Sequence, residues 1–517
     1  HCRGLVSDDD NDQSASDDAF DLLYTIARKR LARRLLTVID ATNVQMESRR
    51  HILALAREYH ALPVAIVLDV GARLCLERSK AREDRKVGAH VVRQQCSLLR
   101  QSLRNLKREG FRYVYVLQSP EELAAVSIER VRLWTDRRDD HGPFDIIGDI
   151  HGCFDELHEL LTDLGYAIAT GEHGGYVVTH PEGRRALFLG DLIDRGPKIA
   201  EVLRLVMDMH ASGIAVCVPG NHETKLLRHL RGHKVKPIHG FGETITQLEA
   251  APPELSRRAE TFIDGLVSHF VLDDGKLVVA HAGLKESLQG RGSGAVREFA
   301  LYGETTGETD EFGLPVRYNW ASEYRGRALV VYGHTPVPAP EWLNRTICVD
   351  TGCVYGGALT ALRYPGLELV SVQARAVYCE PSRPLRPPPA RSAQQEHDEL
   401  LDLADLLGRR SVQTRLRANL SIPAEYSSAA LEVMSRFAVD PRWLIYLPPT
   451  MSPSETSARP GLLEHPAEAL AYFQGADIGT VVIEQKHMGS RAVIIVGQNP
   501  AARSEERRVG KECRLTC

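Results

Sequence analysis

Hydrophobic and polar positions alternate along the N-terminal part of this chain with two periods. Continuous apolar runs at 35–44, 62–70 and 111–117 have the length and β-branched content of buried strands. Residues 81–110 place apolar side chains three and four positions apart, which predicts amphipathic helix. Strands that alternate with helices are typical of an α/β fold with a parallel sheet. We therefore predict an α/β block over residues 1–140.

The alternation continues over residues 144–378, where each apolar run ends in polar residues. The recurring segments are DIIGDIHG, ALFLGDLIDRG, AVCVPGNHE, LVVAHAGL, LVVYGHTPV and ICVDTG. This pattern predicts an α/β sandwich whose strand ends carry the chemistry. The glycines that flank these polar residues permit tight turns and a close approach of the backbone to an ion or a phosphate.

The pattern changes again after the central block. Residues 379–395 are rich in Pro and polar side chains, which is typical of a linker. A leucine-rich helix at 397–410 and a strand at 411–422 are predicted to open a third block, which covers 396–497. The last stretch, 503–517, is charged without periodicity and resembles translated vector sequence, so we exclude it from the predicted fold.

Composition narrows the class of protein. A chain of 517 residues predicts roughly two to four domains. The net charge of −4 excludes a basic nucleic-acid coat but leaves local basic patches open. The ten cysteines include no CxxC pair, which argues against a disulfide scaffold or a zinc ribbon and fits a reducing cytosol. We expect a cytoplasmic fragment without a membrane partner, because there is no starting Met, no signal-peptide pattern and no long apolar run.

Side chains that bind metals follow the central strands in a fixed order. They are Asp149, His151, Asp191, Asp194, Asn221, His222, Glu223, His281, His334 and Asp350. Mixed Asp, His and Asn sets suit borderline divalent ions such as Mn²⁺, whereas carboxylates alone suit Mg²⁺ better. A carboxylate between two sites can bridge two ions about 3.5–4 Å apart, and such a pair can bind phosphate and activate a water.

The motifs GDIHG, GDLIDRG, GNHE, HAGL and GHTPV stand in the same order as in the calcineurin-like binuclear metallophosphoesterases, which this block resembles. The resemblance implies two divalent ions, Mn²⁺ or Ni²⁺, as cofactors. The ligands it implies for the first ion are Asp149, His151 and Asp191. The ligands it implies for the second ion are the shared Asp191 with Asn221, His281 and His334.

The same resemblance implies catalytic roles. His222 is expected to protonate the leaving alkoxide, which is worth about 10²–10⁴-fold in rate, and Arg195 to clamp the phosphate with its guanidinium. Asp194 is expected to orient a neighbour rather than to bind metal. Asp350 stands where the nucleic-acid-repair branch has an active-site Asp, with a strand-end turn residue as the alternative. The aromatic segment 318–320 is expected either to line the substrate or to pack the core.

The N-terminal block carries a basic stretch, residues 73–112, with twelve Lys or Arg against four Asp or Glu. Arg78, Arg82 and Arg85 are predicted to share one helical face. A solvated basic helix is one interpretation, but the stretch also resembles the arginine lid of P-loop polynucleotide kinases, whose arginines grip nucleotide phosphates. Residues 2–13 also resemble a segment of the bacterial polynucleotide 5′-kinases, and this resemblance implies that Arg3 contacts a substrate phosphate. The motif GxxxxGK[ST] is absent, so we predict a partial kinase domain without activity.

The C-terminal block contains the pattern K-x-x-G-x-R, formed by Lys486, Gly489 and Arg491. It resembles covalent nucleotidyltransferases, in which this Lys attacks the α-phosphate of ATP and the Arg helps to bind the nucleotide. A charged surface hairpin is the alternative. Predicted strands at 480–485 and 491–496 favour the ligase interpretation, and the later motifs of that family are absent.

The order of the three blocks resembles the bacterial polynucleotide kinase–phosphatase–ligase proteins of RNA repair. The resemblance implies a phosphatase that removes a 3′-phosphate or a 2′,3′-cyclic phosphate from RNA ends, with ATP and Mg²⁺ as cofactors of the kinase and ligase parts. RNA ends and a methyltransferase complex are the implied partners, and a homodimer is left open. The alternatives are a protein or dinucleotide-polyphosphate phosphatase of the same fold, and a non-catalytic RNA-binding module.

Overall fold

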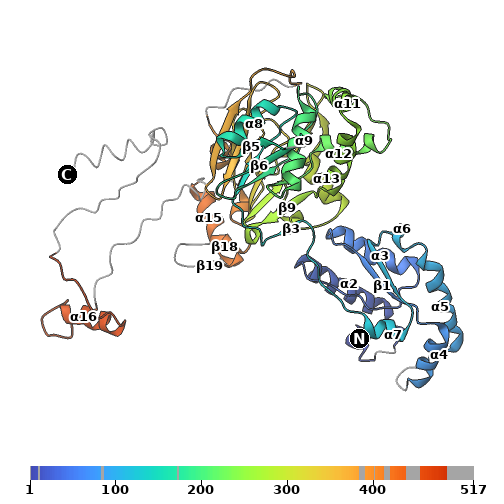
Figure 1. Ribbon diagram of the computed structural model, residues 1–517. Helices are drawn as coiled ribbons and strands as arrows, with labels where there is room; N and C mark the ends of the chain where they lie inside the picture. The colour runs from blue at the N-terminus through green and yellow to red at the C-terminus, as the bar shows by residue number, and fades with distance from the viewer. Residues whose placement is uncertain are drawn as a thin grey trace. The chain divides into compact units, whose positions relative to one another are not determined.

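Helices and strands interleave through most of the protein, which confirms the predicted mixed α/β class (Figure 1). The computed structural model describes residues 2–9, 12–82, 87–171, 174–382, 391–400, 402–412, 420–437 and 455–485. The chain divides into two compact units, 1–440 and 441–517, and each is described by itself.

The N-terminal block has a small parallel sheet, as predicted from its apolar runs. Its elements are α1 (Cys2–Ser7), α2 (Ser16–Ala32), α3 (Met46–Glu58), β1 (Val64–Leu68), α4 (Ala72–Ala81), α5 (Ala89–Leu103), α6 (Leu106–Glu109), β2 (Tyr113–Leu117) and α7 (Pro120–Ala125). Strands β1 and β2 pair in parallel, with Val64 opposite Tyr113. A cluster of Leu53, Val67 and Phe111 packs beneath this pair.

The strand predicted at 35–44 was wrong. These residues have no regular secondary structure, and the side chains of Leu36 and Val38 are 63% and 82% exposed. A strand needs a neighbour to complete its hydrogen-bond ladder, and no strand among the described residues pairs with this segment.

The single helical face predicted for the three basic-stretch arginines was also wrong. Helix α4 carries Arg78 but ends at Ala81, and Arg82 has an extended backbone with φ −76° and ψ 128°. Helix α4 buries none of its residues, so packing does not favour its continuation. Arg85 lies outside the described residues.

The central block is a sandwich of two sheets, as predicted. The strands of the first sheet, in spatial order, are β17 (Glu368–Gln373), β16 (Ala358–Tyr364), β4 (Phe144–Ile147), β7 (Arg185–Phe188) and β8 (Ala215–Cys217). Those of the second are β14 (Glu341–Leu343), β15 (Thr346–Cys348), β13 (Leu329–Tyr332), β10 (Leu277–Ala280), β9 (His269–Leu272) and β3 (Asp136–Arg137).

Helices and two hairpins complete this block. The helices are α8 (Phe154–Asp163), α9 (Ile199–Ala211), α10 (Asn221–Leu230), α11 (Phe241–Ala250), α12 (Pro253–Gly265) and α13 (Gly294–Tyr302), with short 3₁₀ turns η1 (Asp273–Gly275) and η2 (Glu286–Leu288). The hairpins are β5 (Ala167–Thr170) with β6 (Tyr176–Thr179), and β11 (Thr305–Thr309) with β12 (Pro315–Arg317).

The core of the sandwich follows from the alternation of side chains along its strands. Ile146 of β4 packs between the sheets with Val279 and Val331 of the second sheet, and all three are fully buried. The next residue, Ile147, points to the opposite face and packs with Leu157 of α8 and other helical leucines. Strand β4 is therefore buried on both faces, as its continuous apolar run predicted.

Two groups of parallel strands determine where the polar residues gather. Strands β4, β7 and β8 run parallel in one sheet, and β10, β13 and β15 run parallel in the other. The carboxyl ends of parallel strands lie at one edge of their sheet, so the loops after these six strands can converge on a single site.

The described residues of the C-terminal part form short helices and strands. Its elements are α14 (Ala393–Asp398), η3 (Leu403–Asp405), β18 (Arg410–Val412), β19 (Leu420–Ile422), η4 (Ala424–Tyr426), α15 (Ser427–Phe437) and, in the second unit, α16 (Pro466–Gly475). None of the helices in the described ranges combines the length and the apolar character that a membrane span requires.

Three predicted C-terminal elements were wrong. The helix expected at 397–410 stops at Asp398, because Asp402 accepts a hydrogen bond from the amide of Ala404 and caps a new 3₁₀ turn. The strand expected at 411–422 is replaced by the antiparallel pair β18 and β19. Residues 480–485 form no strand, and Val482 is 81% exposed. An exposed apolar run without a described neighbour has no packing to hold it in a sheet.

Candidate metal centre

Seven candidate side chains are delivered by the loops that follow the six parallel strands. They are Asp149 and His151 after β4, Asp191 after β7, Asn221 at the start of α10 after β8, His281 after β10, His334 after β13 and Asp350 after β15. All are buried except His334, which is partly exposed. The structure thus brings together all six predicted metal ligands and Asp350. Their individual roles as ligands stay predictions.

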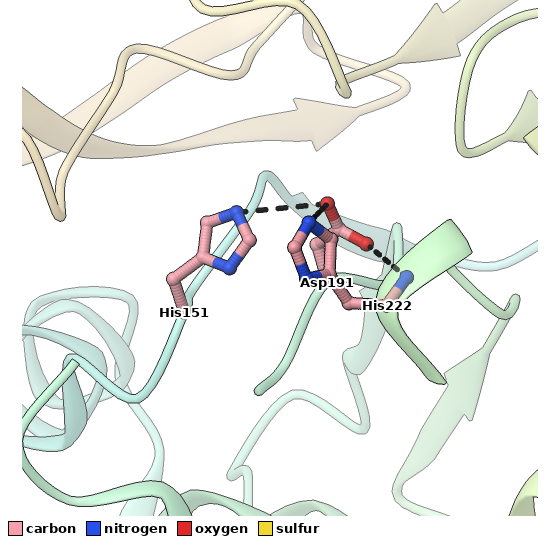
Figure 2. Close-up of side chains that lie close together, drawn as sticks. All are labelled: His151, Asp191 and His222. Atoms are coloured by element: carbon pink, nitrogen blue, oxygen red, sulfur yellow. Dashed lines mark hydrogen bonds and ion pairs between the residues drawn. The ribbon is translucent and has the colours of Figure 1, made fainter. Parts of the chain in front are cut away.

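Asp191 lies between two groups of imidazoles, and Figure 2 shows its carboxylate beside His151 and His222. Its Oδ2 is 3.5 Å from Nε2 of His151 and 3.8 Å from Nε2 of His222. Its other oxygen, Oδ1, is 3.4 Å from Nε2 of His281. The two oxygens therefore face different groups, which is the geometry expected of a bridging carboxylate.

The second group is centred on His281. Its Nε2 lies 3.0 Å from Oδ1 of Asn221 and 2.9 Å from Nδ1 of His334. Two sets of three ligand atoms can be drawn around the shared aspartate, one with His151 and His222 and one with His281 and His334. The first set contains His222, for which the sequence indicated a catalytic role rather than a ligand role.

Asp149 contacts the loop of His334 and lies near His281. Its Oδ2 accepts a hydrogen bond from the backbone amide of His334 at 3.1 Å, and its Oδ1 is 4.0 Å from Nδ1 of His281. Gly333 makes this approach feasible, since a Cβ atom at that position would lie 2.1 Å from Oδ1 of Asp149.

Backbone carbonyls fix the orientation of two imidazoles. Nδ1 of His151 lies 2.7 Å from the carbonyl oxygen of Ile193, and Nδ1 of His281 lies 2.9 Å from that of Leu189. Because a carbonyl can only accept, the proton belongs on Nδ1 and the lone pair of Nε2 points into the site. His151 has a left-handed backbone, with φ 46°, and this strained conformation is held by the surrounding turn.

The buried carboxylates of the metal centre favour the binding of cations. Burial, followed by the nearby charges of Asp350 and Asp191, raises the pKa of Asp149 well above its ordinary value. Burial also raises the pKa of both Asp191 and Asp350 to about 7. Carboxylates that converge in this way repel one another unless positive charge lies between them.

The histidines of the metal centre are also in the protonation state that binds metal ions. Burial lowers the pKa of His281 to about 4 and that of His334 well below its ordinary value, so both imidazoles are neutral, which is their ligand form. Nε2 of His334 is buried and has no hydrogen-bond partner among the described residues. Neutral imidazoles, crowded carboxylates and an unpaired nitrogen suit two divalent ions, which would polarise a phosphate ester and lower the pKa of a water.

A chain of hydrogen bonds supports His222. Its Nδ1 donates to Oδ2 of Asp194, whose Oδ1 in turn accepts from the hydroxyl of Thr244. All three side chains are buried, and burial raises the pKa of Asp194 to about 6. Burial, followed by the charge of Arg195, lowers the pKa of His222. Asp194 thus contacts the imidazole of His222, and its role as an orienting residue stays a prediction.

Arg195 spans the two imidazoles of the first group. Its two terminal nitrogens lie 2.5 Å from Nε2 of His151 and 3.2 Å from Nε2 of His222. The guanidinium also lies over the ring of Tyr355, 5.4 Å from the ring centroid, which is a cation–π arrangement. A planar fork of donors at this position can hold two oxygens of a phosphate.

Three residues of the centre were given no specific role from the sequence, although Glu223 was among the candidate metal-binding side chains. Glu223 accepts hydrogen bonds from the amides of Asp191, Leu192 and Gly220 at 2.7–2.9 Å and so joins two of the ligand loops. Its position three residues after a helix N-cap was a readable signal. Thr244 and Tyr355 have no local sequence signal, because the fold brings them to the site from distant segments.

The other predicted residues are placed as follows. Asp350 accepts from the amide of Gly352 at 3.1 Å, so it is a turn residue and also a neighbour of the ligand groups. Trp320 is 6% exposed and belongs to the core, whereas Tyr318 is 52% exposed. Arg3 lies on α1 of the N-terminal block. Two predicted ligase residues, Lys486 and Arg491, lie outside the described residues.

Comparison with known families divides the chain into three segments. Residues 2–106 match an AAA domain, residues 142–370 match the calcineurin-like phosphoesterases, and residues 429–514 match the ligase part of the PNKP adenylyltransferase domain. The last match extends into the stretch for which the sequence suggested a foreign origin. The three matches stand in the order predicted from the sequence.

Individual relatives cover the phosphoesterase part. Bis(5′-nucleosyl)-tetraphosphatase PrpE [asymmetrical] from Anoxybacillus flavithermus is 46% identical over 239 residues, which are 46% of this chain and 96% of the relative. The protein of the same name from Bacillus subtilis is 46% identical over 241 residues, 46% of this chain and 97% of the relative. A solved protein serine/threonine phosphatase from Saccharomyces cerevisiae is 15% identical, with TM-score 0.33, over 47% of this chain and 84% of its own.

The geometry and the relatives agree on the central block. Its ligand-type side chains converge at the strand ends, its family match covers the same residues, and relatives at 46% identity extend over nearly their whole length. The chain therefore belongs to the calcineurin-like metallophosphoesterases, and it has the domain order of the polynucleotide kinase–phosphatase–ligase proteins.

Proposed function

We propose that the central block hydrolyses a 3′-phosphate or a 2′,3′-cyclic phosphate at RNA ends. The observation that carries this proposal is the domain order: the phosphoesterase lies between an AAA match and a ligase match. A kinase and a ligase act on the two sides of a strand break, and a phosphatase beside them has the unligatable 3′ end as its natural substrate. Recognition of such an end rests on phosphate and ribose, with little readout of sequence.

The protein's own side chains suit one order of events. Arg195 binds two phosphate oxygens and places the ester over the shared carboxylate of Asp191. His222, oriented by Asp194, protonates the leaving ribose oxygen. Burial first, and the charge of Arg195 second, lower the pKa of His222, and an anionic phosphate beside Arg195 would act in the opposite direction to that charge.

The proposal extends to cofactors and partners. We propose Mn²⁺ or Ni²⁺ for the metal centre, and ATP with Mg²⁺ for kinase and ligase parts of the full-length protein, with Lys486 as the nucleophile of adenylyl transfer. RNA ends are the proposed partner in the cytoplasm, together with a methyltransferase complex and a second copy of the chain. This chain lacks GxxxxGK[ST], so we propose no kinase activity for it.

A second function is favoured by a different observation. The relatives at 46% identity are asymmetrical bis(5′-nucleosyl)-tetraphosphatases, and they match the phosphoesterase part over nearly their whole length. The same metal centre can hydrolyse a phosphoanhydride, for which the leaving group needs less help from an acid such as His222.

A direct comparison of substrates distinguishes these functions. The metal-depleted chain is reloaded with Mn²⁺, Ni²⁺ or Mg²⁺ and assayed on an RNA 3′-phosphate, an RNA 2′,3′-cyclic phosphate, diadenosine tetraphosphate and a phosphopeptide. The proposal requires the highest kcat/KM on an RNA end. A preference for diadenosine tetraphosphate supports the second function, and a preference for the phosphopeptide contradicts both.

A further inference from the structure

A second group of metal-binding side chains lies in the phosphoesterase core, apart from the metal centre. The sulfurs of Cys153 and Cys353 and a carboxylate oxygen of Glu156 all lie within 4.8 Å of one another. The three residues are at most 1% exposed. We propose that they bind a Zn²⁺ ion, independently of which phosphate ester is the substrate.

The three ligands come from two loops that also serve the metal centre. Cys153 follows His151 by two residues and is the N-cap of α8, and Glu156 lies in the first turn of that helix. Cys353 follows Asp350 by three residues, in the connection between β15 and β16. An ion held by all three would fasten the first ligand loop to the loop that carries Asp350.

The carboxylate of Glu156 supplies the observation that points to a cation. Its Oε1 accepts hydrogen bonds from the amide of Arg375 at 2.9 Å and from the hydroxyl of Tyr378 at 2.7 Å. Its Oε2 is buried and has no hydrogen-bond partner among the described residues. Buried carboxylate oxygens are rarely left unpaired, because they lose their hydration without compensation. Beside two sulfurs, a cation is the partner that satisfies this oxygen.

The ligand set selects the metal. Two sulfur ligands favour Zn²⁺ over the hard ions Mg²⁺ and Ca²⁺, and they distinguish this group from the metal centre, which contains no cysteine. Three protein ligands leave one tetrahedral position for a water. When Zn²⁺ binds, the two thiol protons are released to solvent and no electron is transferred. This group has no local sequence signal, because its two cysteines are far apart in the sequence and lie in no CxxC pair.

An oxidised pair is the competing interpretation. Two neighbouring thiols could form a disulfide on exposure to a peroxide, but that bond leaves Oε2 of Glu156 without a partner. The two interpretations make different predictions for the number of free thiols and for metal content.

Cobalt substitution tests the proposal on the intact chain. The chain is depleted of metal, loaded with Co²⁺ and examined for sulfur-to-cobalt charge-transfer absorption, which the cysteine-free metal centre cannot produce. We expect the band in the wild type, its loss in Cys353→Ser, and a shift or loss in Glu156→Gln. Cys217→Ser is the matched control, since Cys217 is equally buried but lies outside the group, and it should keep the band.

Zinc content gives a second measurement. Protein purified with Zn²⁺ should lose one equivalent per chain in Cys353→Ser and none in Cys217→Ser, with circular dichroism to verify that each variant is folded. A folded wild type without the charge-transfer band would overturn the proposal even if every variant failed to fold. So would a thiol titration that finds Cys153 and Cys353 joined as a disulfide in the purified protein.

Discussion

The carboxylate of Asp194 accepts a hydrogen bond from Nδ1 of His222, and both side chains are buried. This bond directs Nε2 of His222 toward the shared Asp191 and the guanidinium of Arg195. A carboxylate in this position fixes the tautomer of the imidazole and stabilises its protonated form. If His222 is the general acid, its efficiency depends on Asp194.

Asp194→Asn should therefore lower kcat by about 10–10², with little change in KM, because the amide keeps the shape but not the charge. His222→Gln should lower kcat on an RNA 3′-phosphate by about 10²–10⁴-fold, which is the usual contribution of a general acid. The cost should be much smaller on p-nitrophenyl phosphate, whose leaving group needs no proton. Steady-state kinetics on both substrates measures this. Equal losses on the two substrates would exclude His222 as the acid.

Asp191→Ala should abolish hydrolysis of every substrate. The carboxylate faces both imidazole groups, so its removal takes a ligand from each predicted ion. Metal analysis should show that the variant retains less Mn²⁺ than the wild type, and turnover should fall by at least about 10³, as for other electrostatic machinery. Asp208→Asn is the control, because Asp208 pairs with Arg258 away from the centre. Substantial turnover by Asp191→Ala would show that the centre does not share this ligand.

Arg195→Lys should raise KM more than it lowers kcat on a phosphomonoester. A lysine keeps the charge but lacks the planar fork that can hold two phosphate oxygens. Tyr355→Leu should produce a weaker form of the same defect, since the ring lies under the guanidinium and the cation–π contact is worth about 0.5–2 kcal/mol. Tyr355→Phe keeps the ring and should behave like the wild type. A Tyr355→Phe variant as poor as Tyr355→Leu would instead assign a role to the hydroxyl.

The sequence predicted the centre better than it predicted the outer elements, and the reason is physical. Strands such as β4 are buried on both faces. Their apolar runs, and the glycines that follow them, are local sequence signals of a fixed geometry. Thr244 reaches Asp194 across a sequence separation of 50 residues, which no local pattern can encode. The run at 35–44 and the leucines after Asp398 carried helix or strand patterns, but such patterns form stable elements only where a neighbouring surface buries them.

The stability of the phosphoesterase block should depend on pH through His269, which is not a predicted metal ligand. His269 is fully buried at the start of β9, and its Nε2 accepts a hydrogen bond from the amide of Gly290 at 2.9 Å. Burial lowers its pKa to about 4 in the folded protein, against an ordinary value of 6.5. Between these values the unfolded chain binds the additional proton, so acidification favours unfolding.

His269→Gln removes this titration while it keeps an acceptor for Gly290. In urea unfolding with a chelator present, the stability of the wild type relative to the variant should be constant above pH 6.5. It should then fall by up to roughly 1.4 kcal/mol per pH unit as the pH decreases toward 4. All other groups titrate in both proteins, so the difference isolates His269. A difference that does not change between pH 7 and pH 4.5 would mean that His269 is readily protonated in the folded protein.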